Sequence, residues 1–146
     1  MDKFEPLKID NQLCFPLYAC AKEVIKLYKP LLAPLDLTYT QFITMMVLWE
    51  EGEMNVKDLG KKLFLDSGTL TPVLKKLESK GLITRQRSKE DERVLLVTIT
   101  SEGEALREEA LQVPKQMTQC FQLEEEDAKN LCGILHKILQ GIANQT

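Results

Sequence analysis

A chain of 146 residues can form one domain with a substantial hydrophobic core, and its 44% hydrophobic and 28% charged residues exclude fibrous and disordered classes. No apolar run comes near the roughly 20 residues that a membrane-spanning helix requires. Residues 1–10 have neither the basic start nor the apolar run of a signal peptide, so we expect a cytoplasmic protein with no membrane partner.

Charge is distributed unevenly along the chain, although the net charge is only −3. Between residues 54 and 93 there are ten Lys and Arg against six Asp and Glu, whereas between residues 101 and 130 there are three against eight. The basic middle favours a surface that binds phosphates, and the acidic C-terminal third favours a different partner.

The first helix is predicted over residues 10–34, where leucine and valine recur at helical spacing. Asp10 or Asn11 can cap its start. Pro30 lies late in this stretch and predicts a kink or an early end, because proline lacks the backbone N–H that an interior helical position needs.

Capping signals predict two further helices. Thr38 and Gln41 have the spacing of a capping box, so a helix is expected to begin at Thr38 and to end at Gly52. Residues 55–63 are expected to form a short helix that Asn55 can cap, followed by a break at residues 64–67.

A one-sided apolar stripe predicts a helix that ends at Gly81. Its members recur at i, i+3, i+4 and i+7: Leu70, Val73, Leu74 and Leu77. Its start has two solutions: Thr71 as the N-cap with Pro72 in the first turn, or a start at Ser67 with Pro72 inside the helix.

The pattern then changes to that of strands. Residues 82–87 and 93–99 are rich in β-branched side chains, and the polar residues 88–92 separate them, which predicts a β-hairpin with an exposed tip. Two more helices are expected, one from a Ser101–Glu104 capping box to about residue 119, bent at Pro114, and one over about residues 124–143.

The predicted order, two short helices followed by a hairpin within longer helices, indicates a mainly α fold with a small β-hairpin wing: the winged helix-turn-helix. The second helix of such a motif enters the major groove of DNA, and cations on the wing contact phosphates or a narrow minor groove. The predicted DNA-binding residues are Asp66, Ser67, Thr69, Thr71, Lys75, Lys76, Arg85, Arg87, Lys89, Asp91 and Arg93.

Residues 64–78, with the sequence FLDSGTLTPVLKKLE, resemble the recognition segment of MarR-family regulators, and Asp91 and Arg93 match that family's Asp-x-Arg wing motif. The resemblance covers nearly the whole chain and implies a single domain over residues 1–146. It implies a homodimer in which helices at residues 10–34 and 101–143 interlock, with the winged helix-turn-helix over about residues 38–99. Such a dimer binds double-stranded DNA at a pseudo-palindromic operator.

The segment Asn11-Gln12-Leu13-Cys14-Phe15 resembles the organic hydroperoxide sensor (OhrR-type) branch of this family, which has its sensing cysteine at this position. A helix N-terminus favours the thiolate, and a thiolate attacks peroxide oxygen to give a sulfenic acid. Pro16 departs from the family pattern, where an aliphatic or small residue is usual, and can unwind the first turn. Phe15, Phe42, Met45 and Met46 are expected to form an apolar pocket that selects organic hydroperoxides.

The chain has three tyrosines, and all three match tyrosines of this branch. Tyr18 lies four residues from Cys14 and therefore on the same helical face. In the family, the equivalents of Tyr28 and Tyr39 reach the sensing cysteine from the partner subunit, where their hydroxyls would stabilise the thiolate. The alternative is that Cys14 and the tyrosines are packing residues.

Cys120 is the candidate resolving cysteine, because some members of the branch carry such a cysteine near the end of the fifth helix of the partner subunit. A mixed disulfide between Cys14 and a small thiol is the alternative outcome. Cys20 lies about 9 Å from Cys14 along a helix and on another face, which exceeds the reach of a disulfide. Cys20, Cys132 and His136 are interpreted as packing residues.

The leading hypothesis is a repressor that binds DNA when reduced and releases it when organic hydroperoxide oxidises Cys14. The first alternative is a MarR-type regulator that responds to a small-molecule ligand without thiol oxidation. A thiol peroxidase is disfavoured because the chain lacks a thioredoxin-like βαβ pattern, so no enzyme activity is expected. With one histidine and no Cys-x-x-Cys pair, the sequence predicts neither a metal site nor a cofactor.

Overall fold

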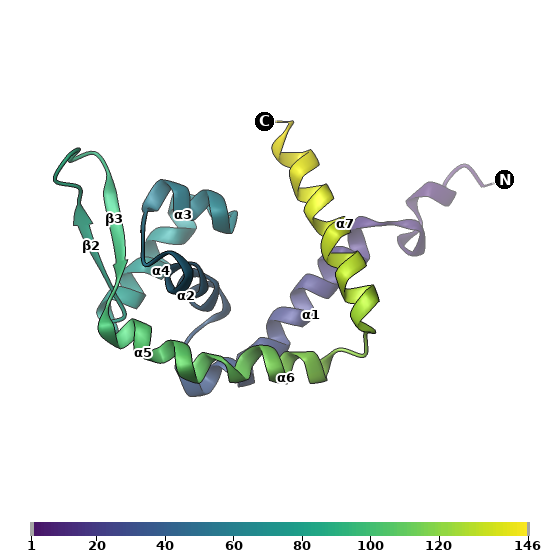
Figure 1. Cartoon of the computed structure of the whole chain (residues 1–146). Helices are drawn as coiled ribbons and strands as arrows, with labels where there is room; N and C mark the ends of the chain where they lie inside the picture. Colours follow the sequence, from purple (N-terminus) through teal and green to yellow (C-terminus); the bar gives the residue numbers. More distant parts are fainter. Residues whose placement is uncertain (1, 146) are drawn as a thin grey trace.

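The computed structural model describes residues 2–145 and consists of helices and one small antiparallel sheet (Figure 1). In chain order its main elements are α1 (Cys14–Leu32), α2 (Tyr39–Glu51), β1 (Glu53–Asn55), α3 (Val56–Leu63), α4 (Ser67–Ser79), β2 (Ile83–Arg87), β3 (Leu95–Ile99), α5 (Ser101–Ala110), α6 (Gln112–Cys120) and α7 (Glu125–Ala143). Three short 3₁₀ helices cover Glu5–Leu7, Ile9–Asn11 and Ala33–Leu35.

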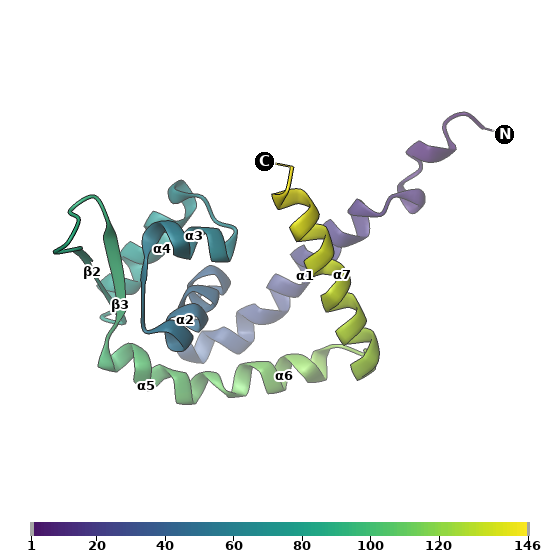
Figure 2. The ribbon, with the colours of Figure 1, turned by 45° about the horizontal axis from the view of Figure 1, so that its top comes forward.

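The elements separate into two regions. Helices α2, α3 and α4 and the sheet gather at one end, whereas α1 and α7 lie toward the other end, and α5 and α6 run between them (Figures 1 and 2). The predicted winged helix-turn-helix, mainly helical with a small β wing, is therefore confirmed as the fold class.

The start of the first helix differs from the prediction. Helix α1 begins at Cys14, and its N-cap position is Leu13, which offers no side-chain hydrogen bond. Asn11 does not cap the helix, because its amide instead donates to the backbone carbonyl of Glu5 at 2.9 Å. Pro16 does not unwind the first turn, since the first backbone N–H groups of a helix have no partner within it. Pro30 lies inside α1, which ends only at Leu32.

The capping box at the start of α2 is confirmed. The Thr38 hydroxyl accepts from the backbone of Gln41, and the Gln41 side chain accepts from the backbone of Thr38. Gly52 ends the helix with φ of 79°, a left-handed value that suits glycine. The predicted cap of α3 is also present, because Asn55 Oδ1 accepts from the backbone of Asp58 at 2.8 Å.

Helix α4 begins at Ser67, which decides between the two starts that the sequence left open. Asp66 is its N-cap, and the Asp66 carboxylate accepts from the backbone N–H of Thr69 at 2.8 Å. The Thr71 start is therefore wrong, and Pro72 lies inside the helix. The carboxylate satisfies one of the N–H groups that a helix start leaves unpaired, so a good cap outweighs the preference of proline for the first turn.

The sheet has three strands rather than the predicted two, in the order β1-β3-β2. Strands β2 and β3 pair antiparallel, with Arg87 opposite Leu95, so the connecting loop is longer than the expected five-residue tip. Strand β1 also pairs with β3. Three residues are too short to show a strand period, which explains why the sequence did not predict β1.

Two details of α5 and α6 also differ from the prediction. The cap of α5 is Thr100, whose hydroxyl accepts from the backbone of Gly103 at 3.0 Å, and not Ser101. The single bent helix expected to residue 119 is divided at Leu111. This break lies one turn before Pro114, which lacks an N–H to donate to the preceding turn.

The core is built on one face of α2. Met45 and Leu48 are fully buried, and they belong to a cluster that includes Leu59 of α3, Leu74 of α4 and Val97 of β3. Trp49 donates its indole N–H to the carbonyl of Gly103 at 2.8 Å and so ties α2 to α5. A β-carbon at Gly103 would overlap the carbonyl oxygen of Leu82 and lie 2.8 Å from Ile99 Cγ1.

The substitution Gly103→Ala is therefore expected to lower the free energy of unfolding by about 2 kcal/mol, because backbone cannot easily move away from the new methyl group. Urea unfolding followed by Trp49 fluorescence measures this. Glu108→Ala, at an exposed position of the same helix, is the control and should change stability by less than about 0.5 kcal/mol. Equal stability of Gly103→Ala and the control would contradict this packing.

Candidate DNA-binding surface and redox site

The predicted recognition residues lie at the start and along the outer face of α4. Ser67 and Thr69 are exposed in the first turn, Thr71 is half-buried, and Lys75 and Lys76 are exposed further along. Asp66 uses its carboxylate to cap the helix. The remaining backbone N–H groups of the first turn point out of the helix end, an arrangement suited to binding a phosphate.

The wing is braced by a pair of residues that the sequence singled out. The Arg93 guanidinium donates to both carboxylate oxygens of Asp91, at 3.1 and 3.3 Å, and the Arg93 backbone N–H donates to the same group. These hydrogen bonds hold the pKa of Asp91 below its ordinary value. The Arg93 side chain is 90% exposed, so the brace orients a cation that remains available to DNA.

Arg85 has different surroundings from the other predicted DNA-binding residues. Its side chain is only 19% exposed, and its guanidinium donates to Glu78 of α4 at 3.0 Å. The Arg85 backbone also donates to Glu78, and these hydrogen bonds lower the pKa of that carboxyl. Arg85 therefore ties the base of the wing to the recognition helix. Glu78 was missed in the sequence because nothing local marks a partner seven residues away.

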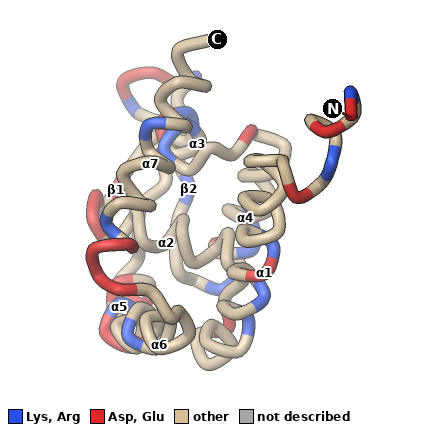
Figure 3. The backbone as a smooth tube through the Cα atoms, turned by 90° about the vertical axis from the view of Figure 1, so that its right-hand side faces the viewer, with Lys and Arg blue, Asp and Glu red and all other residues tan. Residues whose placement is uncertain are grey.

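An open groove of about 1120 Å³ lies between the start of the recognition helix, the wing, α3 and α7. Ser67 and Arg93 line it, as do Lys57 and Lys61 of α3 and the apolar residues Leu139 and Ile142 of α7. Lys and Arg lie around α3 in Figure 3, whereas acidic residues lie along α5. Arg87 and Lys89 add two exposed cations on the wing. The arrangement can bind a polyanion through several separate phosphate contacts.

The candidate redox residues fall into two groups within one chain. Cys14 is the first residue of α1 and is exposed, and Tyr18 is exposed one turn later. Tyr28 lies fourteen residues after Cys14, about 21 Å along the helix, and its ring contacts that of Tyr39 in a tilted arrangement, with centroids 4.7 Å apart. Tyr28 and Tyr39 therefore do not reach the thiol of their own chain.

Burial raises the pKa of Tyr28 above its ordinary value, and the neighbouring Tyr39 raises it further. Burial likewise raises the pKa of Tyr39. Both phenols therefore keep their protons at neutral pH and remain hydrogen-bond donors.

The expected apolar pocket around Cys14 is not formed within the chain. Phe42 and Met45 are buried in the core beside α4, whereas Phe15 and Met46 are largely exposed. All four side chains are apolar, which suggested a common pocket, but the packing of the helices buries two of them and leaves the other two exposed. The interpretation of Cys20, Cys132 and His136 as packing residues is also not met within the chain, because all three are exposed.

Cys120 is the last residue of α6 and is exposed, with no disulfide among the four cysteines, all of which lie in the described part of the chain. Helix α6 packs against α1 of its own chain. A thiol at the end of α6 and a thiol at the start of α1 are therefore both open to a second subunit.

Large apolar side chains are exposed on α1 and α7. Within the described residues, no side chain of α7 is buried, although one face of it is apolar. The exposed set comprises Leu13, Phe15, Leu17, Ile25, Leu27, Leu131, Ile134, Leu139 and Ile142. Contiguous apolar surface of this kind marks a protein interface.

Within residues 2–145, no three His, Cys, Asp or Glu side chains gather as ligands for a metal ion. No single helix in that range is long and apolar enough to span a membrane. Two successive segments, Cys14–Leu35 and Tyr39–Glu51, reach that length and apolar character only when taken together, and the chain bends by 66° between them.

A capped recognition helix beside a braced basic wing defines a winged helix-turn-helix transcriptional regulator. The sequence model of the transcriptional regulator SarA/Rot family matches residues 26–110. The chain belongs to this family of MarR-like winged-helix regulators.

Relatives cover almost the whole chain. The organic hydroperoxide resistance transcriptional regulator of Bacillus subtilis is 46% identical over 139 residues, 95% of each chain. The HTH-type transcriptional regulator SarZ of Staphylococcus haemolyticus is 44% identical over 131 residues, 90% of this chain and 89% of that one.

Solved structures of AbfR from Staphylococcus epidermidis share the fold. Reduced AbfR bound to DNA has a TM-score of 0.82 at 29% identity, with 98% of each chain covered. The disulfide form of AbfR has a TM-score of 0.63 at 29% identity, covering 97% of this chain and 94% of that one. The present structure thus resembles the reduced, DNA-bound form more closely than the disulfide form, and overoxidized AbfR bound to DNA has a TM-score of 0.79 at 30% identity, covering 97% of this chain and 99% of that one.

Removing one wing phosphate contact should reduce the salt dependence of DNA binding. Lys89→Ala is expected to lower the magnitude of the slope of log K against log salt concentration by about 0.9 for each subunit bound, with stability unchanged. Arg85→Ala should instead lower the free energy of unfolding, since Glu78 loses the guanidinium and keeps only the hydrogen bond from the Arg85 backbone. Fluorescence anisotropy at several salt concentrations measures the slope. An unchanged slope for Lys89→Ala would show that this side chain does not neutralise a phosphate.

Proposed function

We propose that this protein is a dimeric, redox-sensing repressor that binds a pseudo-palindromic operator when Cys14 is reduced and releases it when organic hydroperoxide oxidises Cys14. The observation that carries the proposal is the exposed, unpaired thiol of Cys14 at the first residue of α1, in a chain with a complete DNA-binding surface. The name of the Bacillus subtilis relative, an organic hydroperoxide resistance regulator, supports the choice of oxidant. As a transcriptional regulator, the protein would act in the cytoplasm. Each thiol would react with one hydroperoxide molecule, without catalytic turnover.

The proposed chemistry starts at the Cys14 thiolate, because the thiolate is the nucleophilic form of a cysteine. The thiolate sulfur attacks one oxygen of the hydroperoxide, the O–O bond breaks, and a proton converts the leaving alkoxide to an alcohol. Cys14 becomes a sulfenic acid. The thiol of Cys120 from the partner subunit then attacks the Cys14 sulfur, which forms a disulfide and releases water.

Tyr28 and Tyr39 complete the site from the second subunit. They cannot reach Cys14 of their own chain, but their phenols are protonated donors whose rings are in contact. In a dimer, one such pair can face the Cys14 thiolate of the other chain and donate to it. Tyr18, one turn from Cys14, is the donor supplied by the same chain.

Dimerisation also accounts for the exposed apolar faces of α1 and α7, which would pack against the same faces of the partner. The lower likeness to disulfide-formed AbfR than to reduced or overoxidized AbfR, both bound to DNA, supports a change of shape on disulfide formation in this family. A dimer whose two recognition helices change spacing can no longer bind two half-sites one turn apart.

Variants at the two proposed redox cysteines test the chemistry. With cumene hydroperoxide, wild type should release operator DNA, whereas Cys14→Ser should stay bound at the same peroxide concentration because it has no thiolate to oxidise. Cys120→Ser should form the sulfenic acid but no cross-linked dimer on a non-reducing gel. Cys20→Ser is the matched control and should behave as wild type. Equal release by wild type and Cys14→Ser would contradict oxidation of Cys14 as the signal and would favour a small-molecule ligand instead.

The dimer interface makes a separate prediction. Ile134→Asp on α7 places a charge on an apolar face, and it should shift the protein from dimer to monomer in analytical ultracentrifugation. Lys129→Ala, at a charged exposed position of the same helix, should leave the dimer intact. A dimer that tolerates Ile134→Asp at micromolar concentration would exclude this face from the interface.

A further inference from the structure

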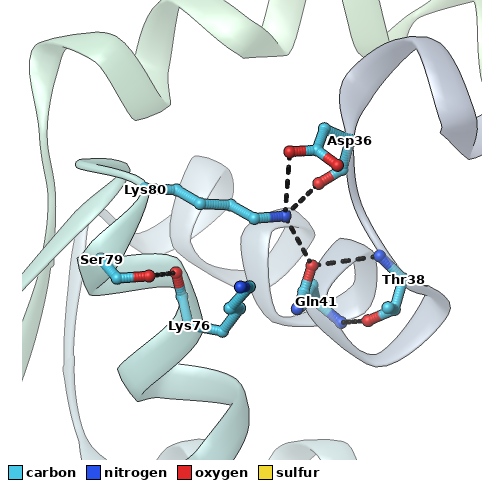
Figure 4. A network of polar contacts seen from close by, with 6 residues as sticks. All are labelled: Asp36, Thr38, Gln41, Lys76, Ser79 and Lys80. Carbon is cyan, nitrogen blue, oxygen red and sulfur yellow. Dashed lines mark hydrogen bonds and ion pairs between the residues drawn. The ribbon is translucent and has the colours of Figure 1, made fainter.

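A polar network joins the end of the recognition helix to the start of α2 (Figure 4). Lys80 follows α4 as its C-cap residue, and its side chain is 19% exposed. The Lys80 ammonium donates to the backbone carbonyl of Asp36, lies 3.5 Å from the Asp36 carboxylate and donates to Gln41 Oε1 at 3.3 Å. The three contacts span about forty residues of sequence.

The acceptors of Lys80 are themselves fixed. Gln41 is only 6% exposed, and its Oε1 also accepts from the Thr38 backbone at 3.1 Å as part of the capping box. Asp36 is the C-cap of the 3₁₀ helix that follows α1, and it adopts a left-handed conformation with φ of 54°. The Asp36 carboxylate is 91% exposed, so the carbonyl and the amide are the main partners.

The same short segment carries one of the proposed redox tyrosines. Tyr39 is the first residue of α2, directly between Thr38 and the turn that holds Gln41. Its ring is in tilted contact with the ring of Tyr28 of α1. A displacement of Tyr39 therefore moves the first turn of α2 and, with it, the oxygens that bind Lys80.

Lys80 must follow these oxygens, because a largely buried ammonium without partners is costly. Apolar packing of α4 on α2 through Leu74 and Leu77 keeps the helices together, but such contacts are not directional. The Lys80 hydrogen bonds instead fix a particular point of α4 to a particular point of α2.

We propose that Lys80 is a positioning residue that transmits the state of the tyrosine pair to the recognition helix. The proposal rests on the proposed redox function and names the connection within that mechanism. When the partner's Cys14 is oxidised and Tyr28 and Tyr39 rearrange, Lys80 carries the displacement of the start of α2 to the end of α4.

The test compares operator affinity of the reduced and the cumene hydroperoxide-oxidised dimer, for wild type, Lys80→Met and Lys80→Arg. Lys80→Met keeps the length of the side chain but removes its donors, so the ratio of the two dissociation constants should fall at least fivefold toward one. Lys80→Arg keeps a cationic donor and should restore most of the ratio. Lys76→Met, one turn earlier on the exposed face, should weaken both states alike and leave the ratio unchanged.

A second readout separates coupling from sensing. Mass spectrometry of the same samples should show Cys14 oxidised as fully in Lys80→Met as in wild type. If Lys80→Met does not fold, Lys80→Gln is used in its place. Lys80→Gln keeps one donor group, so the ratio of the two dissociation constants should fall, but by less than in Lys80→Met. An unchanged ratio in a folded variant with oxidised Cys14 would overturn the proposal. Failure of wild type itself to release DNA after Cys14 oxidation would overturn the proposed function instead.

Discussion

Helix α2 packs against both halves of the molecule, and the rest of the structure depends on this packing. Its inward face contacts α3 and α4 of the DNA-binding region, and it also contacts α1 and α5. The buried residues of α2 include two polar ones, and both are satisfied: the Thr44 hydroxyl donates to the Thr40 carbonyl at 2.7 Å, and Gln41 belongs to the capping box. An element buried on this scale cannot move without moving its neighbours.

This position of α2 relates the two sites that the proposed function requires. The recognition helix packs on its middle, and the tyrosine pair lies at its first residue. The thiol of Cys14 lies about 21 Å from that pair along α1, so one chain holds both parts of the redox site without joining them. In the proposed dimer a second chain completes the site, so dimerisation would be part of the sensing chemistry as well as of DNA binding.

Local chemistry explains which features could be predicted from the sequence. The Thr38–Gln41 box, the Asn55 cap and the Asp91–Arg93 brace involve residues two or three positions apart, so the sequence shows them directly. The cap of α5 was misplaced by one residue because Thr100 and Ser101 both carry hydroxyls. Periodicity likewise could not reveal β1, which depends on pairing with a strand over forty residues away.

Contacts between distant residues explain what the sequence could not provide. The burial of Arg85 against Glu78, and of Lys80 against Asp36 and Gln41, follows from how the wing and α2 pack on α4. Each of these cations has the same local pattern as an exposed lysine or arginine on a DNA-binding face. The candidate redox residues were recognisable through their resemblance to a known branch, whereas their separation within one chain required the structure.

The most direct measurement follows thiol loss and DNA release in one sample. Reduced dimer bound to its operator is titrated with cumene hydroperoxide, while anisotropy reports bound DNA and quenched aliquots report the reduced fraction of Cys14. DNA release is expected to proceed in parallel with loss of the Cys14 thiol and to be complete near one equivalent of peroxide per subunit. DNA release while Cys14 remains reduced, or full oxidation of Cys14 with DNA still bound, would contradict the proposed function.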